Sequence, residues 1–178
     1  GDISSAPIVA ITITVLGKAK NQDRQLLTRS GAKRGKRVAV TGYLGAAAAG
    51  REMLTHQLQF DPEANAQLRR AFLRPYPRIA EGQLLVEHGV KTAIDISDGL
   101  ISDLGHICKS SRVGARIEVD RLPIHPTVKT NFSDKSLELA LSGGEDYELL
   151  FTGSTEVISK VKEAASCPVT VIGEIVAD

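Results

Sequence analysis

The sequence predicts a mixed α/β fold in which layers of helix and β-sheet pack against each other. Over most of the chain, short apolar segments rich in β-branched residues alternate with segments of helical composition, and glycines or prolines separate them. With 178 residues the chain is long enough for one domain, or slightly more than one, with a buried core. Its 42% hydrophobic and 24% charged residues are typical of a globular protein and argue against a disordered chain.

The first expected strand covers residues 8–16, where threonines alternate with isoleucines and a valine in a period of two. A strand needs neighbours to pair with, and the residues that follow it offer none nearby. The only methionine is Met53, so Gly1 is not a translated start. We therefore expect the chain to be a piece of a longer protein, in which another segment supplies the partner of this strand.

The remaining elements alternate along the chain. Further strands are expected at residues 37–41, 90–96, 115–119, 147–152 and 169–172. Helices are expected at residues 46–58, 62–74, 79–88, 99–110, 134–141 and 155–165. Asp61 and Pro62 are typical of a helix start and Pro75 of its end, whereas Pro123 and Pro126 are expected to break the chain.

The overall charge of +1 does not indicate any class of binding partner, because 22 basic residues balance 21 acidic ones. Residues 18–37 carry eight basic residues against one acid, which leaves binding of RNA open as a function. No aromatic residue lies in this stretch to stack on bases, so a solvated connection is favoured and no nucleic-acid partner is expected. No apolar run approaches the roughly 18 residues of a membrane span, so no membrane partner is expected either.

Cysteine use is compatible with a reducing cytoplasm, where we expect this protein. Cys108 and Cys167 form no CxxC pair and cannot build a metal cluster alone. A single disulfide between them stays open at this stage.

Several common catalytic motifs are missing from the sequence. Gly45 and Gly50 have the glycine spacing of a P-loop, but Arg51 and Glu52 follow where lysine and serine or threonine would contact phosphate and metal. There is no GxGxxG fingerprint, no HExxH pair among the four histidines and no GxSxG elbow. These absences argue against P-loop, Rossmann, zinc-hydrolase and α/β-hydrolase chemistry.

The DISDGL segment, residues 95–100, is the strongest local signal, because it joins an apolar strand to an apolar helix. Asp95 and Asp98 would repel a bare phosphate, but Mg²⁺ held between carboxylates and a phosphate resolves this conflict. In the purely structural alternative, Ser97 or Asp98 caps the helix and Asp103 complements its dipole. That alternative leaves Asp95 unexplained.

The GGEDYELL segment, residues 143–150, is a second acidic cluster. Glu145, Asp146 and Glu148 stand between two glycines and an apolar strand, which indicates a second carboxylate wall for a cation or a cationic substrate. The structural alternative is that Gly143 or Gly144 ends a helix in the left-handed conformation and that Glu148 faces solvent.

Together the motifs resemble those of the thiamine-monophosphate kinase family. The matching pieces are Gly1-Asp2, residues 28–32, Thr41-Gly42, the DISDGL segment and the GGEDYELL segment, in this order over essentially the whole chain. The last two separate this family from aminoimidazole ribonucleotide synthetases, selenophosphate synthetases and hydrogenase-maturation dehydratases, which share its general ATP-binding plan.

This resemblance implies a fold, a domain division and a reaction. Each subunit of the family has two α/β domains, and the N-terminal domains pair in a homodimer. Residues 1–17 would be the last strand of the N-terminal domain, and residues 18–178 would be the layered C-terminal domain. ATP would donate its γ-phosphate directly to thiamine monophosphate and give thiamine diphosphate, with several Mg²⁺ ions and no phosphoenzyme.

The resemblance also implies roles for individual residues. ATP would be bound by Gly1, Asp2, Arg29 and Ser97. Mg²⁺ would be bound by Asp2, Asp95 and Asp98. The thiamine substrate would be contacted by Glu145.

One departure from the family lies in the turn at residues 34–36, where Arg34-Gly35-Lys36 stands in place of the usual Pro-Gly-Asp. In addition, further metal-binding aspartates are expected before Gly1 and a substrate-stacking aromatic after Asp178. We therefore expect this chain alone to carry part of the site and to be weak or inactive. The alternatives are a non-catalytic nucleotide-binding module and another ATP-using member of the same superfamily.

Overall fold

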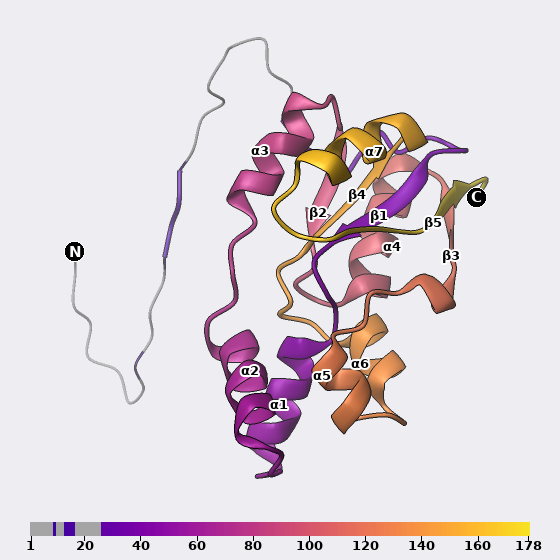
Figure 1. Ribbon diagram of the computed structural model, residues 1–178. Coiled ribbons are helices and arrows are strands. Elements are labelled where there is room, and N and C mark those ends of the chain that lie inside the picture. Colours follow the sequence, from indigo (N-terminus) through magenta and orange to yellow (C-terminus); the bar gives the residue numbers. More distant parts are fainter. Residues whose placement is uncertain (1–8, 10–12, 17–25) are drawn as a thin grey trace.

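A five-stranded antiparallel sheet forms the centre of the computed structural model, which describes residue 9, residues 13–16 and residues 26–178 (Figure 1). Its strands are β1 (Arg37–Thr41), β2 (Thr92–Asp95), β3 (Gly114–Ile117), β4 (Leu149–Gly153) and β5 (Val169–Val176). Their order is β2-β4-β1-β5-β3, and every neighbouring pair is antiparallel. The predicted mixed α/β class is confirmed.

Helices cover both faces of this sheet. On one face lies α4 (Leu100–Ser111), whose Leu104 and Ile107 pack against Val38 and Val40 of β1. On the other face lie α3 (Ile79–Glu87) and α7 (Thr155–Ala164), which pack around Phe151 of β4. The strict alternation of side chains along β1 and β4 supplies both apolar cores at once.

Four more helices gather at one end of the sheet (Figure 1). They are α1 (Ala46–Thr55), α2 (Pro62–Leu73), α5 (Pro126–Asn131) and α6 (Ser136–Ser142). Met53, Leu68, Val128 and Leu139, one from each helix, share a core of their own. A short 3-10 helix, Val119–Arg121, follows β3. None of the helices in the described residues is long and apolar enough to cross a membrane.

The ends of the helices follow the sequence in most places. The carboxylate of Asp61 accepts a hydrogen bond from the amide of Ala64 at 2.9 Å, so the predicted start of α2 is confirmed. The prediction that Pro126 only breaks the chain was wrong, because Pro126 occupies the first turn of α5. A proline is tolerated there since the first amides of a helix have no partner within it.

The predicted strand at residues 8–16 lies largely outside the described residues. Its described part, Val9 and residues 13–16, belongs to no strand and has exposed side chains. The assignment of residues 1–17 to a separate domain stays a prediction.

The two cysteine thiols are free. Cys108 belongs to α4, and Cys167 precedes β5. The disulfide left open by the sequence is therefore not formed.

Two helical glycines provide a matched test of helix packing. A Cβ atom on Gly50 of α1 would lie 2.2 Å from the carbonyl oxygen of Leu68 in α2, whereas one on Gly105 of α4 would meet nothing within 4 Å. We expect Gly50→Ala to lower the free energy of unfolding by about 1–3 kcal/mol through overpacking. Gly105→Ala should raise it by about 0.5–1 kcal/mol through helix propensity. Urea unfolding measures both, and equal stability of the two variants would contradict the described α1–α2 contact.

Candidate functional site

The DISDGL and GGEDYELL segments lie side by side because they continue the pairing of β2 with β4 beyond the strand ends. The amide of Ile96 donates to the carbonyl oxygen of Glu148 at 2.8 Å, and the amide of Tyr147 donates back to Ile96 at 2.9 Å. One step further, the amide of Glu145 donates to the carbonyl oxygen of Ser97 at 3.0 Å. Two motifs that are 48 residues apart in the chain thus form one surface.

Glycines permit this close approach of backbone to backbone. A Cβ atom on Gly144 would lie 2.3 Å from the carbonyl oxygen of Ser97. Gly99 has φ of 117°, and a Cβ atom there would lie 2.9 Å from the carbonyl oxygen of Ser142. A side chain at Gly144 would push the two segments apart, and one at Gly99 would push the DISDGL segment away from the end of α6.

Asp103, a buried residue of α4, organises the turn that contains Ser97 and Asp98. Its Oδ2 accepts hydrogen bonds from the amides of Ser97, Asp98 and Gly99 at 3.0, 3.1 and 3.2 Å. Burial raises the pKa of this carboxyl, and the three amide donors oppose that shift. The alternative in which Ser97 or Asp98 caps the helix was wrong, because Gly99 is the N-cap and Asp103 satisfies the free amides from within the helix.

An exposed surface, which we name the acidic face, consists of Asp95, Asp98, Glu145 and Tyr147. The carboxylates of Asp95, Asp98 and Glu145 all belong to exposed residues. The hydroxyl of Tyr147 donates to Oε2 of Glu145 at 2.9 Å. This hydrogen bond raises the pKa of Tyr147, and the charges of Asp95 and Asp98 add to the effect.

Asp146 points away from the acidic face and caps α1. Its carboxylate accepts hydrogen bonds from the amides of Gly45 at 2.7 Å and Ala47 at 3.1 Å. The N-cap residue of α1, Gly45, has no side chain for this task, so a residue 101 positions away performs it. Burial raises the pKa of Asp146 to about 6.

Glu148 also points away from the acidic face, into an ion pair. Arg78 donates from Nε and Nη2 to the two carboxylate oxygens of Glu148, both at 2.7 Å, and the hydroxyl of Thr41 donates to the same carboxylate at 2.6 Å. The alternative that Glu148 faces solvent was wrong, since only 7% of this residue is exposed. Sequence reasoning did not single out Arg78, and no spacing signal relates it to a partner 70 positions away.

The two glycines of the GGEDYELL segment do not end α6 in the left-handed conformation. Gly143 is extended, with φ of −72° and ψ of 128°. Positive φ occurs instead at Glu145 (70°) and Tyr147 (50°). Gly143 is the C-cap of α6, as the structural alternative expected, but the left-handed conformation was wrong. Close packing requires glycine here, because a Cβ atom on Gly143 would lie 2.1 Å from the carbonyl oxygen of Leu139.

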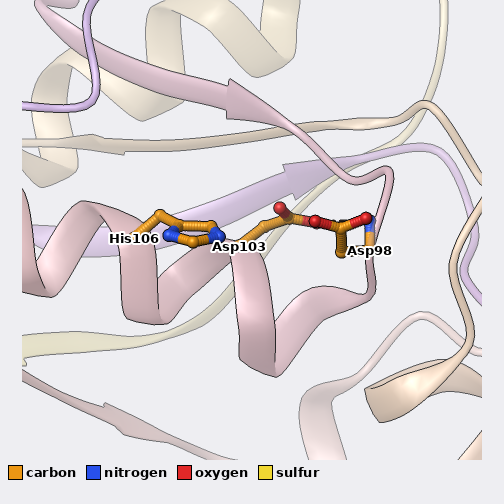
Figure 2. Close-up of side chains that lie close together, drawn as sticks. All are labelled: Asp98, Asp103 and His106. Carbon is orange, nitrogen blue, oxygen red and sulfur yellow. Dashed lines mark hydrogen bonds between the residues drawn. The ribbon is translucent and has the colours of Figure 1, made fainter.

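The donor chemistry of the acidic face fits Mg²⁺. Asp95 and Asp98 offer hard carboxylate oxygens, and no ion pair with a described residue neutralises them. Asp98 also lies close to Asp103 and His106, with one ligand atom of each within 4.8 Å of the others (Figure 2). Asp103 is already engaged by three amides and His106 offers nitrogen, so Asp95 and Asp98 are the better oxygen donors for Mg²⁺.

Among the described residues, the predicted ATP ligand Arg29 does not join this face. Arg29 lies beside the C-terminal end of α4, where its carbonyl oxygen accepts a hydrogen bond from the Ser111 hydroxyl. The 12 residues of α4 separate that end from the DISDGL segment by about 18 Å. Gly1 and Asp2 lie outside the described residues.

Comparison with known proteins gives the family. Residues 33–178 match the model of the AIR synthase related protein, C-terminal domain. The chain belongs to this family. The solved structure of the thiamine-monophosphate kinase from Stenotrophomonas maltophilia K279a resembles this chain with a TM-score of 0.79 and 34% sequence identity. The match covers 85% of this chain and 51% of the chain in that structure. The structure of AaThiL complexed with AMPPCP and TMP resembles this chain with a TM-score of 0.74 and 32% sequence identity. That match covers 86% of this chain and 49% of the AaThiL chain.

Curated relatives confirm the resemblance to thiamine-monophosphate kinases. The thiamine-monophosphate kinase of Salmonella typhimurium is 52% identical over 128 residues, which is 71% of this chain and 39% of the relative. The chain thus spans less than half of this relative and about half of the two solved structures.

The buried ion pair predicts unequal effects of two arginine substitutions. Arg78→Met leaves Glu148 buried without its partner and should lower the free energy of unfolding by about 3 kcal/mol. Arg116→Met, the control, removes an arginine whose side chain is 71% exposed in its pair with Glu174, and should cost less than about 1 kcal/mol. Urea unfolding of both variants would contradict this assignment if the order were reversed.

The carboxyl of Asp146 predicts a pH dependence. Its folded pKa of about 6 lies above the ordinary 3.8, so the folded chain keeps a proton that the unfolded chain has lost. Stability should therefore fall as the pH rises from about 4 to 6, by on the order of 3 kcal/mol, and level off above 6. In Asp146→Asn this loss should vanish.

Urea unfolding from pH 4 to 7 tests this, with Asp120→Asn at an exposed site as the control. A stability difference between wild type and Asp146→Asn that does not change with pH would contradict the raised pKa.

Proposed function

We propose that this chain is the C-terminal part of a kinase that transfers the γ-phosphate of ATP to thiamine monophosphate and releases thiamine diphosphate and ADP. The observation that carries the proposal is the acidic face, where the two most specific motifs of the sequence meet through backbone hydrogen bonds. The relatives named thiamine-monophosphate kinase, and the neighbour complexed with AMPPCP and TMP, support the same reaction.

The acidic face suits phosphoryl transfer between two polyanions. In this proposal Asp95 and Asp98 hold Mg²⁺, which would offset the charge of the phosphates and align them. Ser97 contacts ATP from the turn that Asp103 holds in place, and Glu145 contacts the thiamine substrate from the neighbouring segment. Three exposed carboxylates in one place repel each other, and bound cations would relieve that repulsion.

Other parts of the site belong to the same proposal. Gly1 and Asp2 would contribute to ATP and metal binding, with residues 1–17 as the last strand of an N-terminal domain and residues 18–178 as the C-terminal domain. Arg29 would reach ATP only if the nucleotide extends toward the far end of α4 or the loop at residues 28–32 moves. Pairing as a homodimer, a cytoplasmic location and the lack of a nucleic-acid partner stay predictions.

Removal of either aspartate tests the proposal. In the complete product of the gene, Asp95→Asn and Asp98→Asn should each lower kcat by roughly 100-fold and require more Mg²⁺ for half-maximal rate, because the phosphate charges lose their counter-charge. A coupled ADP-release assay with thiamine monophosphate and varied Mg²⁺ measures both quantities.

Asp120→Asn, at an exposed position in the 3-10 helix, is the control and should leave the rate unchanged. Full activity of Asp95→Asn would contradict the metal role, and no turnover by the complete wild-type product would favour a non-catalytic nucleotide-binding module. The 178-residue chain alone should show at most a trace of the activity, and a rate equal to that of the complete product would contradict its partial site.

A further inference from the structure

The GGEDYELL segment presents its side chains alternately to two sides. Glu145 and Tyr147 belong to the acidic face, whereas Asp146 and Glu148 point to the opposite side. The two rear carboxylates accept five hydrogen bonds, from Gly45, Ala47, Thr41 and twice from Arg78. The segment is therefore anchored from behind at alternate positions.

The backbone of the segment is strained at the two front positions. Glu145 and Tyr147 have φ of 70° and 50°, a region that residues other than glycine rarely adopt. Such strain persists only where the surrounding structure enforces it, and it concentrates at functional sites. Here the rear anchors and the hydrogen bonds to Ile96 and Ser97 enforce it.

The hydroxyl of Tyr147 is hydrogen-bonded to the carboxylate of Glu145. This hydroxyl donates to Oε2 of Glu145 at 2.9 Å on an exposed surface. Without that donor, the negative charges of Asp95 and Asp98 would drive the flexible glutamate toward solvent. The hydrogen bond leaves Oε1 of Glu145 available to a ligand, since no described residue donates to it in the structure.

From this arrangement we infer that Tyr147 is a positioning residue that holds Glu145 against the positively charged ring of the phosphate acceptor. The inference rests on the proposed function and assigns different ligands to different carboxylates of the acidic face. Asp95 and Asp98 serve the phosphates through Mg²⁺, and Glu145 remains as the carboxylate without a metal. The thiazolium ring of thiamine monophosphate carries a permanent positive charge, and a fixed carboxylate recognises such a charge better than a mobile one.

Tyr147→Phe tests this inference in the complete gene product. It should raise KM for thiamine monophosphate by about tenfold, the cost of a lost hydrogen bond to a charged group, and leave kcat and KM for ATP within about twofold. Calorimetry without ATP should show the same tenfold rise in Kd for thiamine monophosphate. Tyr76→Phe, which removes a hydroxyl from a residue that is 65% exposed, is the matched control and should change none of these values.

Two further measurements separate positioning from a general structural effect. In the Glu145→Gln background, Tyr147→Phe should change KM by less than about twofold, because its effect passes through the carboxylate. A neutral isostere of thiamine monophosphate, with an uncharged ring in place of thiazolium, should bind wild type more weakly than the cationic substrate does. Tyr147→Phe should narrow that preference by about tenfold.

The possible outcomes are distinct. Equal KM of wild type and Tyr147→Phe, an equal loss in the Glu145→Gln background, or a parallel change in kcat and KM for ATP would each overturn this inference alone. Failure of the wild-type complete product to bind or phosphorylate thiamine monophosphate would overturn the proposed function, and the inference with it. Circular dichroism and thermal unfolding verify that each variant is folded.

Discussion

The backbone pairing between the DISDGL and GGEDYELL segments is the contact on which the candidate site depends. Hydrogen bonds from Ile96, Tyr147 and Glu145 carry the β2–β4 pairing past the ends of both strands. The acidic face exists only because this pairing holds, since its residues come from two distant parts of the chain. The apolar cores on both sides of the sheet stabilise the same two strands, so the stability of the fold and the geometry of the site share one cause.

Some carboxylates in and beside the two acidic segments serve the structure, and others are free to contact a ligand. Asp103, Asp146 and Glu148 are engaged by backbone amides, hydroxyls or Arg78, and none of them is available without a loss of stability. The exposed carboxylates of Asp95, Asp98 and Glu145, by contrast, have no cationic partner among the described residues. A surface that concentrates unpaired negative charge on a rigid support is suited to binding Mg²⁺ and a cationic substrate.

The local sequence pattern was sufficient to predict most of the helices and strands. The short apolar segment at residues 37–41 and the Asp61-Pro62 start of α2 predicted elements that the structure contains. The local sequence pattern failed at positions where packing against distant segments decides the backbone conformation. Gly143 ends α6 as a glycine cap would, but it is extended instead of left-handed, and Pro126 looks like a break but begins α5.

The sequence by itself determined most of the strands and helices, the two acidic motifs and, through these motifs, the family. These features depend on neighbouring residues, whose spacing is visible in the chain. Only the tertiary structure decided which carboxylates are free and which are engaged, because Asp146 finds the start of α1 and Glu148 finds Arg78 across 101 and 70 positions. Such pairs form when the sheet brings distant segments together, and no local pattern records them.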